Sequence, residues 1–361
     1  MRFANRVVKT IKPYKVSSPK AWEYVGDQNV LKLDWNESTI GPSPRVYEAI
    51  TNTFSQNRWN WYPNINNTEL IRAISVYCNL PESNVQFFAG SDALHEYIVR
   101  CFISHQDRIL SISPTYDNFR AVVEANGGNV YQYSLDNRFL LDYDKLDTDL
   151  ELIDPKIVYL VNPNNPTGTF HSLEKLSILI KKHVNILFII DEAYFEFTNK
   201  SIAYLTIECD NLIVSRTFSK AFGLASFRIG YCAAHSTIID SLNKIRNPKS
   251  VSLFAQEAAR SALIDLEYMQ NYVREVNASK LFVFDELTKI KWIEPFWGEG
   301  NYLFLRIESN KLESFLSFLE SKKVFLRDYS HMKNTVNFVR LTIGLKEQMS
   351  RVLDCINEFD K

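Results

Sequence analysis

One pattern occurs five times in the middle of the chain: a short apolar run rich in Ile, Val and Phe ends abruptly in a polar cluster. These runs lie in residues 85–92, 108–116, 156–168, 185–194 and 211–220. Apolar runs of this length and composition are typical of buried strands. Helical patterns lie between several of them, as in residues 172–183, where Ser172 is a candidate N-cap. Alternating strands and helices predict an α/β fold with a mostly parallel central sheet flanked by helices.

The polar clusters would all lie at the carboxyl ends of these strands, where open α/β sheets bind ligands. Turn formation alone would explain the segment NPNNPTG at 162–168, because Asn, Pro and Gly favour turns. It does not explain a lysine, an aspartate and an arginine that each lie beside a buried strand. We therefore expect one site built from several strand ends.

The last third of the chain has a different pattern. From about residue 258 a long helical, charged stretch leads to an apolar strand at 301–307, an amphipathic helix at 312–322, two further strands and a final helix. This order predicts a smaller α+β domain. We expect a large domain over residues 36–257 and a small domain formed by residues 1–35 and 258–361.

Composition excludes several classes of protein. The 361 residues include 41 basic and 42 acidic side chains, so the basic excess typical of nucleic-acid and membrane-surface binders is missing. No apolar run approaches the roughly 20 residues that span a bilayer. The five cysteines are widely spaced and form no C-x-x-C pair, and the histidines show no ligand spacing, so we expect no metal site and a reducing, cytoplasmic setting.

The strand ends carry a distinctive set of groups. Asp191 ends an apolar strand, where a carboxylate is costly unless it is paired. Lys220 ends another, where burial would lower its pKa and make it nucleophilic. Ser91 and Asp92 open a helix after a glycine, and free N–H groups at a helix start favour a phosphate. With Arg228 and an aromatic ring nearby, this set matches what pyridoxal phosphate requires.

On these residues the chain resembles the fold-type-I pyridoxal-phosphate aminotransferases of class I/II, and most of all the histidinol-phosphate aminotransferases. The resemblance rests on an ordered series of motifs over most of the chain: LDWNESTIGPSP (33–44), WYPN, AGSDALHEYI, SPTY, VNPNNPTG, IIDEAYFEF, TFSKAFGLASFRIGY, FLRD and FVRLTIG. It implies an enzyme that uses pyridoxal 5'-phosphate to move an amino group between a small, possibly phosphorylated, amino compound and a 2-oxo acid, in amino-acid biosynthesis.

The resemblance also implies catalytic roles. Lys220 would hold the cofactor covalently and then act as base and acid. Asp191 would pair with the ring nitrogen and keep the ring cationic. Tyr194 and Asn165 would hydrogen-bond the ring 3'-oxygen, and Asn165 would also lie against the substrate.

Further residues would bind the rest of the cofactor and the substrate. Arg340 would bind the substrate α-carboxylate in bidentate fashion, and Arg327 resembles an arginine that binds a substrate phosphate. The remaining cofactor contacts would be a stacking ring at Tyr116 and phosphate ligands at Ser91, Asp92, Thr217, Ser219 and Arg228, with Tyr62 reaching the cofactor of the partner subunit in a homodimer.

Some positions depart from the family pattern. The family usually has GLAGLR after the lysine, and this chain has GLASFR with the bulkier Phe227. Lys249 and Ser250 stand where relatives have Tyr and Asn near the substrate, and Trp35 is also unusual. These differences suggest a paralogue with another amino donor or acceptor.

Two alternatives share the cofactor motifs. A decarboxylase of an O-phospho amino acid on the same fold would differ only in which Cα bond lies perpendicular to the ring. A non-catalytic, cofactor-binding regulatory protein is the second; the intact lysine and the lack of a DNA-binding segment before the fold argue against it.

Overall fold

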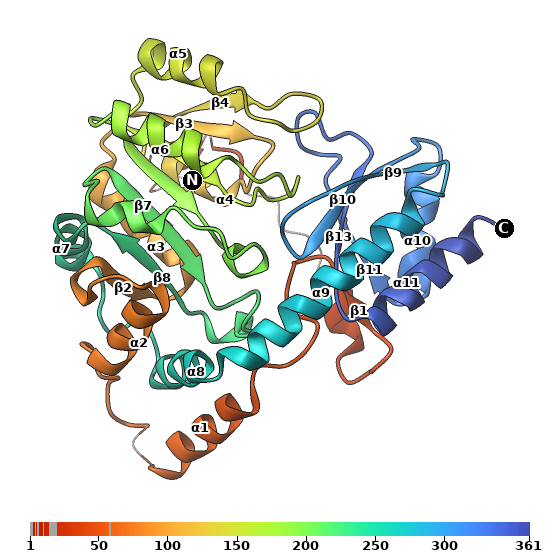
Figure 1. Ribbon diagram of the computed structural model, residues 1–361, viewed down its shortest axis with the longest axis horizontal. Helices are drawn as coiled ribbons and strands as arrows, with labels where there is room; N and C mark the ends of the chain where they lie inside the picture. Colours follow the sequence, from red (N-terminus) through yellow and green to blue (C-terminus); the bar gives the residue numbers. More distant parts are fainter. Residues whose placement is uncertain (1–2, 4, 6, 10, 14–19, 58) are drawn as a thin grey trace.

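The computed structural model describes residues 3, 5, 7–9, 11–13, 20–57 and 59–361. The chain forms two main sheets that lie side by side, with the long helix α9 (Leu266–Leu287) running beneath the smaller one (Figure 1). Among the described residues, no helix is both long and apolar enough to cross a membrane.

The larger sheet confirms the five expected strands and adds two. Its seven strands have the order β2-β8-β7-β6-β5-β3-β4, and only the pairs that involve β8 are antiparallel. The expected strands are β2 (Val85–Phe88), β3 (Arg108–Ser113), β5 (Ile157–Val161), β6 (Leu187–Asp191) and β7 (Leu212–Thr217); the added ones are β4 (Asn129–Ser134) and β8 (Gly230–Ala234). The sheet is therefore mostly parallel, as the sequence predicted.

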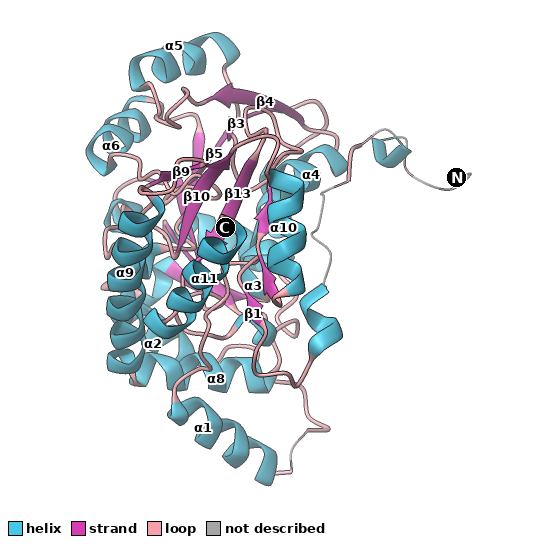
Figure 2. Ribbon diagram, turned by 90° about the vertical axis from the view of Figure 1, so that its right-hand side faces the viewer, coloured by secondary structure: helices cyan, strands magenta, loops and turns pink. Residues whose placement is uncertain are grey.

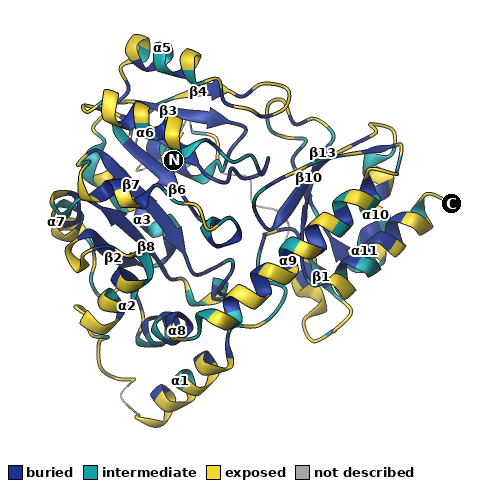
Figure 3. Ribbon diagram, viewed as in Figure 1, coloured by how far each residue is buried: buried dark blue, intermediate teal, exposed yellow. Residues whose placement is uncertain are grey.

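Helices cover both faces of this sheet, and the alternation of side chains along the strands explains why. In β5, Tyr159 and Val161 face one apolar cluster, whereas Val158 and Leu160 face the other. The first cluster includes α3 (Gly90–Phe102), α4 (Asn118–Ala125) and α7 (Ser236–Ile245). The second includes α2 (Thr68–Cys78), α5 (Tyr143–Ile153) and α6 (Leu173–Lys182). Figure 3 shows the strands of this sheet as largely buried, whereas the surrounding helices have both buried and exposed residues.

The expected N-cap at Ser172 is confirmed, because its side chain accepts a hydrogen bond from the backbone N–H of Lys175. The helical, charged stretch expected from about residue 258 falls in two helices, α8 (Leu253–Ile264) and α9. They are separated at Asp265, whose backbone is not helical and whose carboxylate accepts a 2.5 Å hydrogen bond from Ser43 Oγ. Ser43 also caps α1 (Pro44–Ser55), which packs on α8.

The smaller sheet is antiparallel and has the order β12-β13-β10-β9. Its strands are β9 (Ile293–Phe296), β10 (Tyr302–Ile307), β12 (Arg327–Asp328) and β13 (Phe338–Thr342), flanked by α10 (Leu312–Ser321) and α11 (Lys346–Phe359). Figure 2 shows these helices in front of the strands. The sequence did not predict β9, whose Pro295 argues against a strand and which forms only an edge of the sheet.

The segment before the large sheet joins the small one. β1 (Leu31–Lys32) pairs in parallel with β11 (Val324–Phe325). This pairing agrees with the expected small domain of residues 1–35 and 258–361, although the boundaries stay a prediction. Residues 1–2, 4, 6, 10 and 14–19 of its N-terminal part lie outside the described residues.

Candidate functional site

The polar residues at the strand ends meet where the two sheets face each other. Lys220 follows β7, and its Nζ donates a 2.8 Å hydrogen bond to the backbone oxygen of Trp35, which follows β1. Burial, with a contribution from the nearby Arg340 guanidinium, lowers the pKa of Lys220 to about 8. The lowered pKa agrees with the sequence-based expectation, and a neutral lysine amine is a nucleophile; the catalytic role of Lys220 stays a prediction.

Asp191 is the last residue of β6 and is almost completely buried. Its Oδ2 accepts a 3.0 Å hydrogen bond from the Tyr159 hydroxyl, and its Oδ1 accepts one of 3.1 Å from the backbone N–H of Ala193. Burial raises the pKa of Asp191, and the His95 imidazole and these hydrogen bonds partly offset that effect. Both carboxyl oxygens of Asp191 are thus held by hydrogen bonds, in a buried place that disfavours the charged form.

A cradle for an anion lies at the start of α3. The helix begins at Gly90 without a side-chain cap, so its first N–H groups are available to a ligand. A Cβ on Gly90 would lie 2.9 Å from the Arg228 guanidinium, and one on Gly230 would lie 3.0 Å from the backbone nitrogen of Ser91. The two glycines therefore allow the arginine and the backbone to approach the helix start closely.

The expected phosphate ligands around this cradle are close together. Asp92 Oδ2 forms a 3.2 Å ion pair with Arg228, and its Oδ1 accepts a 2.9 Å hydrogen bond from the Tyr116 hydroxyl. Thr217 Oγ1 donates to Ser219 Oγ at 2.9 Å. Arg228 has a positive φ of 52°, an uncommon conformation for a side-chain-bearing residue. Such strain is found where the surrounding structure holds a functional group in place.

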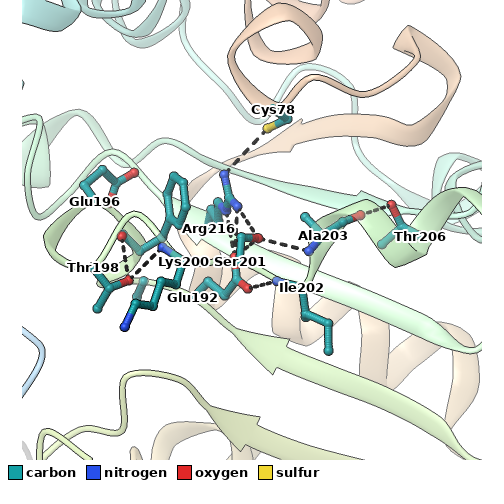
Figure 4. A network of polar contacts seen from close by, with 12 residues as sticks. Cys78, Glu192, Glu196, Thr198, Lys200, Ser201, Ile202, Ala203, Thr206 and Arg216 are labelled. Atoms are coloured by element: carbon teal, nitrogen blue, oxygen red, sulfur yellow. Dashed lines mark hydrogen bonds and ion pairs between the residues drawn. The ribbon is translucent and has the colours of Figure 1, made fainter. Parts of the chain in front are cut away.

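Behind these residues lies a buried ion pair. Arg216 donates to Glu192 Oε2 from Nε at 3.0 Å and from Nη2 at 2.9 Å, and both side chains are buried (Figure 4). Arg216 directly precedes Thr217, and Glu192 directly follows Asp191. The pair therefore fixes the ends of β6 and β7 relative to each other. Buried Glu196 lies in the same region, and burial raises its pKa to about 7.

The two sheets share a hydrogen-bond network. Asn165 Oδ1 accepts from Arg340 Nη1 at 2.5 Å and from the Tyr329 hydroxyl at 3.3 Å. The Tyr194 hydroxyl accepts a 3.0 Å hydrogen bond from Asn36 Nδ2. The predicted residues Asn165 and Tyr194 therefore both contact groups that the small sheet or its neighbouring loop supplies.

Two arginines of the small sheet lie on neighbouring strands, and Arg340 joins this network. Arg340 on β13 is buried, and its Nη2 donates to the backbone oxygen of Asp34 at 2.5 Å. Arg327 on β12 is also buried and is the direct cross-strand neighbour of Arg340. Each guanidinium has the planar set of N–H donors that binds carboxylate and phosphate groups.

Tyr62 is not brought to this site by its own chain. Its side chain is 77% exposed on the loop between α1 and α2, where Lys249 Nζ lies 4.5 Å from the centre of its ring. Its expected role toward a partner subunit stays a prediction. Trp35 is one of the residues that depart from the family pattern. Its backbone oxygen accepts the hydrogen bond from Lys220, and the centre of its indole ring lies 4.4 Å from Lys32 Nζ.

Sequence reasoning missed several groups that contact the predicted ones. The sequence places Tyr159 within a strand and Asn36 within a motif, and neither pattern indicates the group that each contacts. His95 lies on the buried face of α3 beside Ile98 and Val99, and the sequence analysis gave it no role. A fully buried polar residue on such a face was the available signal, because burial of an imidazole without a partner is costly.

Comparison with known proteins identifies the family. The model of the family "Aminotransferase class I and II" matches residues 28–356. The dihydroxyacetone phosphate transaminase of Campylobacter jejuni is 43% identical, over 99% of this chain and 97% of its own length. The histidinol-phosphate aminotransferase of Methanococcoides burtonii is 31% identical, over 91% of this chain and 90% of its own.

A solved structure has the same fold. The histidinol-phosphate aminotransferase of Sinorhizobium meliloti, determined with pyridoxal-5'-phosphate, superimposes with a TM-score of 0.88 at 22% identity and covers 99% of this chain and 98% of that one. The chain belongs to the class I and II aminotransferases and is a pyridoxal-phosphate-dependent aminotransferase.

Proposed function

We propose that this class I and II aminotransferase transfers the amino group of an amino acid to a small ketone that carries a phosphate ester. The observation that carries the proposal is the pair of buried arginines, Arg327 and Arg340, on neighbouring strands. The names of the relatives at 43% and 31% identity both specify phosphorylated substrates, and this agreement supports it.

The residues present fit pyridoxal phosphate. The close approach of Gly90 and Gly230 to Arg228 and the start of α3 leaves a cradle that Cβ atoms would fill, and its donors suit a phosphate. Lys220 offers an amine with a lowered pKa, and Asp191 a buried carboxylate. Bound there, the cofactor supplies an aldehyde for amines and a ring that accepts the electron pair of a substrate carbon.

The chain's own residues account for the proton movements. Lys220, whose pKa is lowered to about 8, is suited to take a proton from the substrate carbon and to return one. Tyr194 and Asn165 would hold the 3'-oxygen of the ring, and Asp191 would hold a proton on the ring nitrogen. Thr217, Ser219, Arg228, Ser91 and Asp92 would bind the phosphate of the cofactor, and Tyr116 would stack on the ring.

The two arginines would bind different anionic groups of the substrates. Arg340 would bind the α-carboxylate of the amino donor, since it also contacts Asn165. Arg327 would bind the phosphate of the acceptor. A planar guanidinium forms two parallel hydrogen bonds with either anion.

We further infer that the acceptor resembles dihydroxyacetone phosphate in chemical structure more than it resembles imidazole acetol phosphate, the ketone that corresponds to histidinol phosphate. Both compounds share the phosphorylated ketone, so they differ in whether a hydroxyl or an imidazole ring extends from it. The 43% identity to the first type of transaminase supports this choice. The indole of Trp35 and the substitutions at Lys249 and Ser250 agree with an altered pocket.

The test is a comparison of acceptors. Purified enzyme is incubated with L-glutamate and either dihydroxyacetone phosphate or imidazole acetol phosphate, and the amine product is identified by mass spectrometry. We expect kcat/KM to be at least about tenfold higher for the first acceptor, a difference of about 1.4 kcal/mol in the transition state. A preference for the imidazole compound would contradict the choice of acceptor. Release of CO₂ from an O-phospho amino acid without a keto product would contradict transamination.

Assembly and location are also part of this proposal. We infer a cytoplasmic homodimer in which Tyr62 reaches the partner's cofactor. Support comes from the exposed aromatic side chains of α1 and the loop after it: Tyr47, Phe54, Trp59, Trp61 and Tyr62. All five cysteines are free thiols, in agreement with a reducing compartment. Light scattering of the purified protein would test the dimer, and a monomer at micromolar concentration would contradict it.

A further inference from the structure

His95 is the most completely buried histidine near the site, and the chemistry described so far does not use it. It lies on α3, its side chain is 0% exposed, and its ring meets the rings of Phe119 and Tyr159 edge to face at 5.5 Å each. Neither of its ring nitrogens has a hydrogen-bond partner among the described residues. Burial of a polar group without a partner costs free energy, so a histidine here requires an explanation.

The carboxyl group of Asp191 lies close to the ring of His95. His95 Nε2 lies 3.6 Å from Asp191 Oδ2, slightly beyond a hydrogen bond but close enough for a strong electrostatic interaction. The same Oδ2 accepts the hydrogen bond from Tyr159. The imidazole and the phenol, which also contact each other, therefore both act on one oxygen of the carboxylate.

The electrostatic surroundings of Asp191 show why this contact matters. Burial raises the pKa of Asp191, and Asp92 adds to the increase. Among the influences that lower it, His95 is the largest, ahead of Tyr159 and the backbone of Ala193. An aspartate that became neutral could no longer hold a proton on a ring nitrogen.

The position of His95 on the helix links both ends of the site. Ser91 and Asp92 lie at the first turn of α3, beside the anion cradle, and His95 follows about one turn later. One rigid helix would therefore set both the anchor of the cofactor phosphate and the environment of the carboxylate at the other end of the ring.

We propose that His95 is a positioning residue for Asp191: its ring N–H faces Oδ2, and it keeps the carboxylate ionised and oriented toward the cofactor ring nitrogen. This inference rests on the role of Asp191 proposed above. It predicts that His95 affects the cofactor only through the ring nitrogen, and leaves the phosphate and aldehyde contacts unchanged.

The test compares two ligands of the apoenzyme. Pyridoxal phosphate has the ring nitrogen, and its 1-deaza analogue has a C–H in that place. The ratio of their dissociation constants measures how much the nitrogen contributes to binding. We expect His95→Leu to reduce this ratio roughly tenfold, the size of one hydrogen bond to a charged group. His95→Gln, which keeps an N–H donor, should retain most of the ratio.

A second histidine provides the control. His171 is about as deeply buried as His95, and its Nε2 likewise lacks a hydrogen-bond partner among the described residues. Within the described structure, Asp191 forms its histidine ion pair with His95 and not with His171. His171→Leu should leave the ratio unchanged. If His95→Leu weakens both ligands equally, its role is structural and the inference is wrong. An unchanged ratio would also refute it.

Asp191→Asn separates this inference from the proposed function. If that variant does not reduce the ratio, Asp191 does not pair with the ring nitrogen and the proposed role of Asp191 fails. If it does and His95→Leu does not, only the role of His95 fails. Should His95→Leu not fold, the wild-type protein with ¹⁵N-labelled histidine decides: we expect a low-field imidazole N–H signal that disappears in Asp191→Asn, and its absence from the wild type refutes the inference.

Discussion

The two sides of the candidate site are built differently. On the large sheet, each residue is carried by a short motif at the end of its own strand, as Asp191 ends β6 and Lys220 follows β7. On the small sheet, Arg327 and Arg340 come together because two strands pair in one particular register. The first arrangement depends on local sequence and the second on tertiary pairing. The cofactor side should therefore tolerate less change in chemistry, and the substrate side should be the place where specificity varies.

The strongest test of the cofactor side is Lys220→Ala. We expect kcat to fall by more than about 10⁴-fold, because the variant loses both the nucleophile and the proton carrier. The thermal unfolding midpoint should stay close to that of the wild type. Steady-state rates and calorimetry measure the two quantities. The matched control is Lys181→Ala on the exposed face of α6, and retained activity in Lys220→Ala would invalidate the assignment.

The corresponding test of the substrate side is Arg327→Ala. We expect kcat/KM for the phosphorylated acceptor to fall about 100-fold, in line with loss of a bidentate charged contact, whereas the half-reaction with the amino donor changes little. Initial rates with each substrate varied in turn separate the two effects. Arg306→Ala, an exposed arginine on β10 paired with Glu294, is the control. An equal loss for donor and acceptor would show that the arginines do not divide the substrates.

The junction of the two sides can be disturbed at Gly168. Its φ is +78°, and a Cβ would lie 2.4 Å from Cα of Gly298, so the backbones themselves would have to separate. We expect Gly168→Ala to lower the free energy of unfolding by about 1–3 kcal/mol. Gly26→Ala is the control, because Gly26 has a φ of +96° but open space around it. Equal losses in chemical denaturation would mean that backbone strain, and not the contact between glycines, is responsible.

The smallest expected effect couples the two sides through charge. The positive charge of Arg340 contributes to the lowered pKa of Lys220, after burial. The amine is reactive when neutral, so its modification rate in the apoenzyme should rise with pH and level off above about 8. In Arg340→Gln the pKa should rise, and the profile should move to higher pH. Labelling with trinitrobenzenesulfonate and peptide mapping would measure this. An unmoved profile would show that the charges do not interact.

The same contrast explains how much the sequence could predict. The five strands, the helix capped by Ser172 and the cofactor motifs were predictable because each depends on residues close together in the chain. Three features were not predictable, because each depends on a partner that has no fixed spacing in the sequence. The end of α8 at Asp265 depends on Ser43, and the strand β9 depends on its neighbour β10. The contact between Tyr159 and Asp191 depends on the pairing of β5 with β6.

His95 illustrates the limit of pattern reasoning most clearly. Its spacing places it on the buried face of α3, and the position alone predicts an ordinary core residue. Only the three-dimensional fold brings Asp191, 96 positions later in the chain, next to its ring. Periodicity therefore predicts which face of a helix is buried, but it does not predict which group lies against that face.

The loop after β1 connects Lys220 to Arg340, the proposed substrate anchor. Asp34 gives its backbone oxygen to Arg340, and the next residue, Trp35, gives its own to Lys220. A carboxylate bound by Arg340, as proposed, would compete with the backbone oxygen of Asp34. Two consecutive peptide oxygens thus hold both side chains, so one short loop sets the spacing between the amine and the guanidinium.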